Sequence, residues 1–206
     1  IEWRAPAGKR VLMDFTRLVS LTDRHLGIEE VRIVLPEDSA PVMLSSQIMN
    51  RQDGQDEFGS ATSASRPASP EDVTQATVNT GSDPRRADNF KARVFVPVMQ
   101  VNEGEKIALG YRIKNSGMAL VVGADHDFST SNDFYVSSSA APDMAKVQYH
   151  VDARPGEEIV LTKYFSYHDS YRASVSELMD RVEETLQRAH KHGPMDYVES
   201  QREWLA

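Results

Sequence analysis

The sequence contains no cysteine among its 206 residues. Disulfide scaffolds, cysteine-ligated zinc sites and thiol nucleophiles are therefore excluded. A chain without cysteine is compatible with the cytoplasm, which is the location we expect.

Long hydrophobic runs and an excess of positive charge are also missing. No apolar run approaches the roughly 18 residues of a transmembrane helix, and the opening IEWRAPAGKR has no signal-peptide core. The net charge of −8 argues against a nucleic-acid partner, because phosphate backbones are bound by basic patches. We therefore expect a soluble chain that binds neither membrane nor nucleic acid, and its length is enough to bury a core.

Apolar residues alternate with polar ones over most of the chain, which predicts β-strands. Two hairpins are expected, around the turns KNSG (residues 114–117) and ARPGEE (residues 153–158). Pro97 lies inside the run that begins at Val94 and cannot donate to a strand ladder, so that strand should be an edge or carry a bulge. Many short strands with turns between them predict an antiparallel β-sandwich.

Residues 57–89 interrupt this pattern with a stretch rich in serine, alanine, threonine and proline. Similar strand patterns lie on both sides, so we interpret it as a long surface loop within one sandwich domain, residues 1–170. Its Arg85 and Arg86 are candidates for the lip of a substrate mouth or an interface, the alternative being a solvated pair of charges.

Beyond Tyr167 the hydrophobic period becomes 3.6 residues, which predicts a helical segment over residues 171–206. Ser174 and Glu177 fit a capping box at its start, and Gly193-Pro194 ends the first helix. Tyr197, Trp204 and Leu205 share one face of a second helix that stops without a cap. We expect these three residues to contact another domain, in a longer polypeptide.

Several clusters of polar residues could be catalytic, but their spacing argues against it. Asp125, His126 and Asp127 could hold a metal, yet neighbours on a strand point to opposite sides, so a solvated strand-end loop is favoured. Glu29-Glu30 and Glu157-Glu158 are adjacent in sequence, whereas glycosidase carboxylates face each other across a gap of roughly 5–9.5 Å.

Two further clusters contain histidine. His168, Asp169 and Ser170 lie within three positions but without a nucleophile elbow. His190 and His192 fall at the expected helix end, where cations suit the helix dipole. The residues alone therefore predict no catalytic residue, no metal and no cofactor in this chain.

Two stretches carry a resemblance to a known family. PAGKRVLMDFTRLVSLTDRHLGIEEVRIVLPEDSAPVMLSSQIMN and PGEEIVLTKYFSYHDS, the latter followed by a helix and YVESQREWLA, are similar to the N-terminal domain of glycoside hydrolase family 65. DPRRA in the long loop also fits. The family contains maltose, kojibiose and trehalose phosphorylases and some trehalases. Its usual opening segment, of roughly N-G-x-x-G-x-R-G type, is not found here.

The resemblance implies a large antiparallel super-sandwich of the galactose-mutarotase-like kind, then an amphipathic helix and a truncated linker helix. An (α/α) barrel would follow, as the partner of this domain and the site of catalysis. None of the family's catalytic or phosphate-binding residues maps onto this chain.

The parent enzyme would then cleave an α-glucosidic disaccharide with inorganic phosphate or water, and would be a candidate homodimer. The alternative from another class is a free-standing carbohydrate-binding or scaffolding sandwich.

Overall fold

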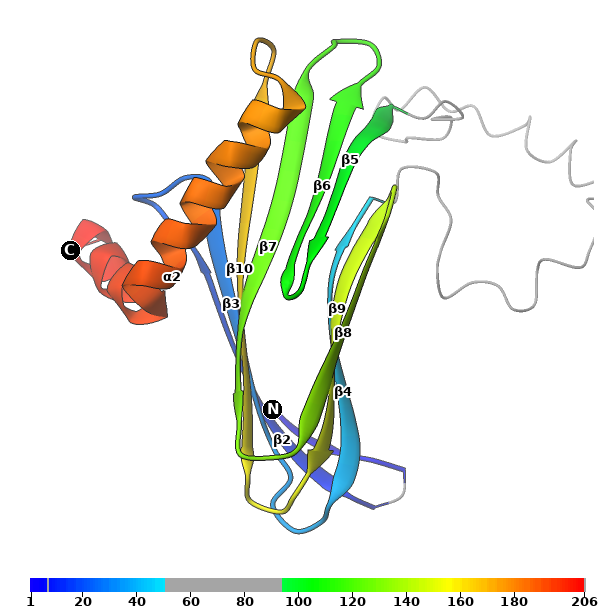
Figure 1. Ribbon diagram of the computed structural model, residues 1–206. Helices are drawn as coiled ribbons and strands as arrows, with labels where there is room; N and C mark the ends of the chain where they lie inside the picture. The colour runs from blue at the N-terminus through cyan, green and yellow to red at the C-terminus, as the bar shows by residue number, and fades with distance from the viewer. Residues whose placement is uncertain (7, 51–93, 206) are drawn as a thin grey trace, which may run out of the picture.

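The computed structural model describes residues 1–6, 8–50 and 94–205, which form two antiparallel sheets and a helix (Figure 1). The larger sheet has the order β1-β2-β3-β10-β7-β6-β5, and the smaller one has the order β4-β9-β8. In chain order the strands are β1 (Glu2–Arg4), β2 (Arg10–Val19), β3 (Leu26–Val34), β4 (Ala40–Met49), β5 (Phe95–Glu103), β6 (Lys106–Ile113), β7 (Ala119–Thr130), β8 (Phe134–Ala141), β9 (Met144–Ala153) and β10 (Glu158–Ser170).

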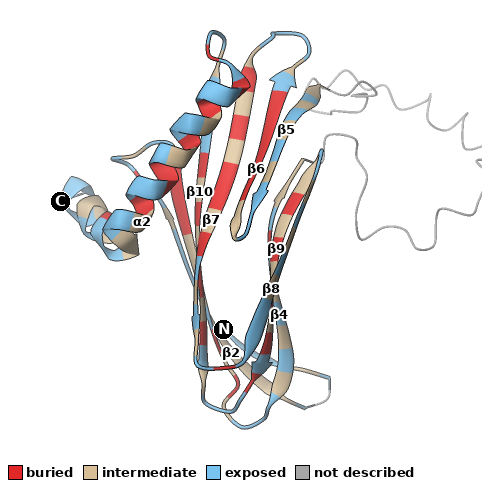
Figure 2. Ribbon diagram, in the orientation of Figure 1, coloured by how far each residue is buried: buried red, intermediate tan, exposed pale blue. Residues whose placement is uncertain are grey.

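The core lies between the two sheets, where the inward residues of each strand meet. Leu109, Val147, Tyr149 and Ile159 are completely buried there. Figure 2 shows buried residues alternating with more exposed ones along β7 and β9, as the period-2 pattern predicts. The predicted mainly-β sandwich is confirmed.

Pro97 predicted that its strand is an edge or carries a bulge, and in β5 both alternatives occur. It is one of the two outer strands of the large sheet among the described strands, and its register against β6 shifts between Pro97 and Met99. The hairpin of β6 and β7 is also as predicted, with Gly117 at a φ of 71°.

The prediction of a second hairpin, around residues 153–158, is wrong. Strands β9 and β10 are consecutive, but β9 pairs with β4 and β8, whereas β10 pairs with β3 and β7. The turn with Gly156 instead carries the chain from one sheet to the other, and the Gly156 N–H donates to the Leu35 carbonyl at 2.7 Å. Alternation shows which residues of a strand face the core. Because both sheets face the same core, the pattern did not distinguish two strands paired in one sheet from two strands in different sheets.

Helix α2 (Val175–Leu205) covers the outer face of the large sheet over β10 and β7. Ser174 Oγ accepts the N–H of Glu177 at 3.1 Å, so the predicted cap forms, while the Glu177 carboxylate pairs with Arg181. Gly193, at φ 74° and ψ 165°, breaks the helix into two segments at the predicted position.

The first segment of α2 packs through a buried stripe that contains Leu178, Val182 and Leu186. Gly123 of β7 lies beneath it, and a Cβ there would come within 2.5 Å of Val182 Cγ1. A residue without a side chain at this point is what lets the helix approach the sheet closely.

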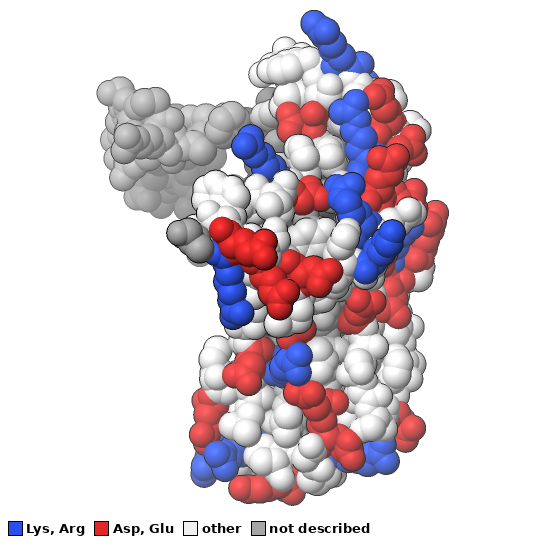
Figure 3. Space-filling model, turned by 90° about the vertical axis from the view of Figure 1, so that its left-hand side faces the viewer, with Lys and Arg blue, Asp and Glu red and all other residues white. Residues whose placement is uncertain are grey.

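Acidic and basic side chains are interspersed over the face of the molecule that carries α2 (Figure 3). No helix in the described ranges has the length and apolar character required to cross a bilayer. Residues 57–89, including Arg85 and Arg86, lie outside the described residues.

Candidate functional site

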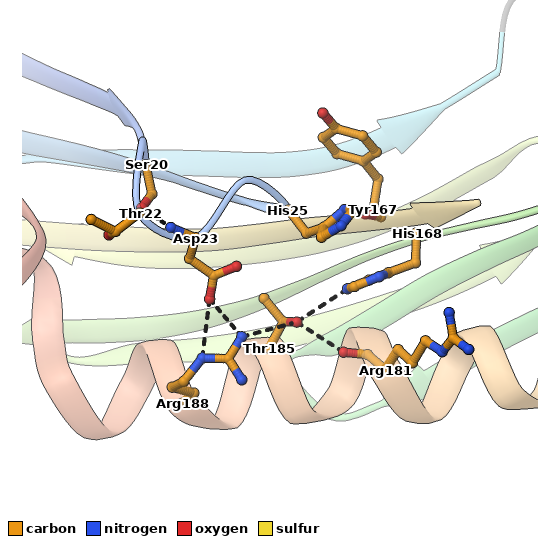
Figure 4. Close-up of polar contacts among 9 residues, drawn as sticks. All are labelled: Ser20, Thr22, Asp23, His25, Tyr167, His168, Arg181, Thr185 and Arg188. Atoms are coloured by element: carbon orange, nitrogen blue, oxygen red, sulfur yellow. Dashed lines mark hydrogen bonds and ion pairs between the residues drawn. The ribbon is translucent and has the colours of Figure 1, made fainter. Parts of the chain in front are cut away.

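A polar site lies where the loop between β2 and β3 meets the first segment of α2 (Figure 4). Asp23 on the loop accepts hydrogen bonds from Arg188 Nε at 3.0 Å and Arg188 Nη2 at 2.5 Å. The Asp23 N–H donates in turn to Ser20 Oγ at 2.9 Å, which holds the carboxylate toward the helix. The two partners are 165 positions apart in sequence, so this ion pair ties the first strands to the C-terminal helix.

Two histidines stack beside this ion pair. The rings of His25 and His168 lie 4.0 Å apart at an angle of 23°. The Thr185 hydroxyl donates to the Arg181 carbonyl, so the His168 Nε2, 3.1 Å from Thr185 Oγ1, carries the hydrogen that joins them. Burial lowers the pKa of His168, and the neighbouring side chains of His25 and Arg181 lower it further.

A pocket of about 530 Å³ opens next to the ion pair, at the break in α2. It is lined by Thr22, Asp23, Arg188, His192, Asp196, Tyr197 and Ser200. Hydroxyl, carboxylate and guanidinium groups give it hydrogen-bonding capacity. Because Asp23 and Arg188 neutralise each other, the arrangement suits positioning and binding better than proton transfer.

The sequence reasoning missed this site, although each half carried a signal. Asp23 lies in a polar turn between two strands, and Arg188 lies near the predicted helix end. Nothing in the local pattern pairs them, because their contact depends on how α2 crosses the sheet.

Three of the four paired glutamates form ion pairs with arginines, and the fourth, Glu157, accepts a hydrogen bond from a serine. Glu29 and Glu30 contact Arg17 and Arg32 at 2.7 and 2.8 Å. Glu158 also reaches Arg32, at 3.4 Å, and Glu157 hydrogen-bonds Ser131. Glu29 and Glu30 point to opposite faces of β3, as expected for strand neighbours, and the ion pairs give each carboxylate a structural role.

Ser170 at the end of β10 acts as a turn residue. Its Oγ accepts the N–H groups of Arg172 and Ala173, both at 3.1 Å, just before helix α2. His168 contacts Thr185 instead, so the described structure does not join His168, Asp169 and Ser170 into a triad.

The favoured interpretation of residues 125–127 as a solvated strand-end loop is wrong. These residues lie within β7, where alternation sends His126 into the sandwich and the two aspartates toward α2. Asp125 and Asp127 lie on either side of His190, each with an oxygen 3.3 Å from a ring nitrogen. His190 therefore links α2 to β7, a role that its position near a helix end did not reveal.

His126 is 5% exposed and fully hydrogen-bonded. Its Nδ1 lies 2.7 Å from the Glu105 carbonyl and must donate, so Nε2 accepts from the Ser46 hydroxyl, also at 2.7 Å. Burial lowers the pKa of His126 to about 4, with a smaller contribution from the positive charge of Lys163. His126 is thus a neutral residue of the core.

The three residues expected at a domain contact differ in burial. Tyr197 is 8% exposed and packs within this chain, whereas Trp204 and Leu205 are 63% and 67% exposed. Their contact with another domain stays a prediction.

Within the described residues, no group of three or more histidine, aspartate and glutamate side chains is placed to hold a metal ion.

The family comparison agrees with the fold. The family model described as "Glycosyl hydrolase family 65, N-terminal domain" matches residues 1–206. This chain belongs to that family. The resemblance found in its strand and helix segments is confirmed.

Relatives of this family 65 N-terminal domain are much longer than the chain. An uncharacterised glycosyl hydrolase of Mycobacterium tuberculosis is 26% identical over 98% of the chain and 23% of its own length. The α,α-trehalose phosphorylase of Thermoanaerobacter brockii is 24% identical over the whole chain and 24% of its own length. The chain therefore spans about a quarter of the curated relatives it matches.

A solved structure provisionally named a kojibiose phosphorylase, from the human microbiome, shares the fold. It superposes with a TM-score of 0.70 over 98% of this chain and 22% of its own, at 12% identity. At that identity the match establishes the sandwich architecture of the family 65 N-terminal domain and nothing about substrate.

Proposed function

We propose that this family 65 N-terminal domain is the non-catalytic sandwich of a glycoside phosphorylase or hydrolase that acts on α-glucosidic disaccharides. In this proposal the domain supports a catalytic (α/α) barrel of the same polypeptide, and inorganic phosphate or water is the barrel's co-substrate. The cytoplasm is the proposed location, which fits a chain without cysteine.

The observation that carries the proposal is the contrast between the two segments of α2. The first is fixed to the large sheet by its buried stripe and by the Asp23–Arg188 ion pair. Beyond Gly193, the second segment exposes Met195, Trp204 and Leu205, each by more than 60%. A large apolar side chain left in water forgoes on the order of 2–3 kcal/mol of burial energy, so this segment favours a further packing partner.

The state of the acidic residues supports a non-catalytic role. The carboxylates first considered as acid–base pairs, Glu29, Glu30 and Glu158, each contact an arginine. Glycoside hydrolysis by paired carboxyl groups requires one protonated and one ionised carboxyl on either side of the scissile bond. Each of these carboxylates instead contacts an arginine of this domain, which is a structural role.

The experiment compares the 206-residue chain with the whole polypeptide encoded by its gene. Each is incubated with maltose, trehalose or kojibiose, with and without inorganic phosphate, and the release of glucose and glucose phosphate is measured. We expect the whole polypeptide to turn over one of these sugars and the 206-residue chain to give only the blank rate. Turnover by the 206-residue chain, or none by the whole polypeptide with any α-glucoside, would contradict the proposal.

A further inference from the structure

The outer face of the small sheet lies on the side of the molecule opposite α2 (Figure 1). Strand register places its outward side chains in rows that run across β4, β9 and β8. One row contains Met43, His150 and Tyr135. This row crosses all three strands and gives the face an apolar, aromatic band.

Hydrogen-bonding rows flank this band on both sides. On one side Pro41 pairs with Asp152, whose N–H donates to the Asp133 carbonyl at 3.0 Å, so the two aspartates are neighbours. On the other side Ser45, Gln148 and Ser137 are in register. The band is therefore bordered by carboxylates along one edge and by hydroxyl and amide groups along the other.

The face is hollowed between the aromatic row and the acidic row. A groove of about 340 Å³ is lined by both rows and by the intervening residues Val42, Val151 and Phe134. The side chains between the wall residues point to the other side of the sheet and pack into the sandwich core. They are the buried Val151 and the partly buried Val42 and Val136. The groove thus has one aromatic wall and one acidic wall on a floor of regular sheet.

The aromatic wall is ordered by its own contacts. The rings of Tyr135 and His150 are parallel within 5° at a centroid distance of 4.4 Å, so His150 covers one face of the tyrosine. Gln148 Nε2 lies 3.4 Å from Met43 Sδ and holds the other end of the row. Tyr135 is nonetheless 63% exposed, and β8 is an outer strand among the described ones.

We propose that this groove is an accessory binding site for an α-glucoside, separate from any site in the barrel. The C–H face of a glucosyl ring lies across the exposed edges of the row that Tyr135, His150 and Met43 form, and the carboxylates of Asp133 and Asp152 accept hydrogen bonds from its hydroxyl groups. A pyranose presents both surfaces at once, an apolar face and a rim of hydroxyl donors, which the band and its two flanking rows match.

The choice of α-glucosides rests on the proposed function, whereas the recognition chemistry requires only a pyranose. A basic side chain of a protein partner would satisfy the two aspartates as well. The row of Ser45, Gln148 and Ser137 favours the sugar, because neutral donors and acceptors suit hydroxyl groups on both edges of the band.

The test is a titration of the ¹⁵N-labelled 206-residue chain with maltose, maltotriose and maltohexaose, followed by amide chemical shifts. We expect saturable shifts at Met43, Tyr135, His150 and Asp152, with a dissociation constant on the order of 1 mM, as befits one open subsite. Tyr135→Ala should weaken binding at least tenfold. The matched control is Tyr171→Ala, because Tyr171 is also an exposed tyrosine, 73% accessible, outside the groove residues.

A second variant, Asp152→Asn, distinguishes binding of a sugar from binding of a basic side chain. Its amide oxygen still accepts a hydroxyl hydrogen, so sugar affinity should fall by a factor of only about three to ten. Binding of a cation should fall further than binding of the sugar, because the variant removes one of the two negative charges, and a parallel titration with an arginine-rich peptide measures this.

Saturable binding of the oligosaccharides that Tyr135→Ala weakens and Tyr171→Ala preserves supports the proposal. Absence of saturable shifts, shifts mapped to the pocket beside Asp23, or groove binding by the peptide alone overturns it. The spectrum of each variant also reports whether it is folded. Sugar binding is measured without turnover, so the two proposals can fail separately. An inactive whole polypeptide would refute the proposed function without contradicting sugar binding in the groove. An active whole polypeptide whose groove binds no sugar would refute only the accessory site.

Discussion

Acidification from pH 7 to pH 5 should destabilise this domain through His126. The imidazole is 5% exposed and its pKa is lowered to about 4, against 6.5 for an unperturbed histidine. Between these two values the unfolded chain binds a proton that the folded chain does not. The free energy of unfolding therefore falls as the pH falls through this window, and the contribution is regained above pH 6.5.

The expected magnitude follows from the two pKa values. The difference in proton binding corresponds to a loss of about 2 kcal/mol between pH 7 and pH 5, from this residue alone. The groups around it act in both directions: Lys163 of β10 and His190 of α2 lower the pKa of His126, whereas Asp125 and the Glu105 carbonyl raise it. Burial is the largest cause, so the net direction is downward.

Urea denaturation at pH 7, 6 and 5 measures this, with His126→Gln as the comparison. The glutamine can keep a hydrogen bond but does not titrate, so its free energy of unfolding should lose about 2 kcal/mol less than that of the wild type over this range. Equal pH dependence in the two proteins would refute the reasoning. If the variant does not fold, an NMR titration of the His126 ring decides: a pKa near 6.5 would show that burial does not depress it.

Three other perturbations follow from the packing of α2. Gly123→Ala should cost about 1–3 kcal/mol of unfolding free energy, since its Cβ meets Val182, and Val182→Ala in the same chain should recover part of that loss in urea titrations. Asp23→Asn should cost about 1 kcal/mol at low salt and less in 1 M salt, because its partner Arg188 is half exposed; an unchanged cost at both salt concentrations would argue against the ion pair. Trp204→Ser should alter the stability of the 206-residue chain by less than about 0.5 kcal/mol in calorimetry while reducing self-association, and a large loss would show that this end packs on the sandwich.

Elements with a strong local signal were predictable from the sequence. Strand alternation identified the sandwich, Pro97 indicated an edge or a bulge, and Ser174 and Gly193 marked the start and the break of α2. In each case a few neighbouring residues determine the backbone conformation through steric fit, a missing donor or a capping hydrogen bond. Strand β8 carries little signal of its own, because its SSSAA segment has almost no apolar alternation, and its pairing with β9 holds it in the sheet.

The tertiary structure alone decided the pairings and the polar contacts. Period-2 alternation placed His126 and its aspartate neighbours on opposite sides of the strand. Because β7 packs between the helix and the core, His126 is a buried neutral base and the two aspartates are partners of His190. The Asp23–Arg188 pair and the row of Met43, His150 and Tyr135 likewise join residues from distant parts of the chain. The local sequence determines to which side of a strand or helix a side chain points. The residues that it contacts depend on the order of the strands and on how the helix crosses the sheet. Both arise only when all the elements bury their apolar faces together.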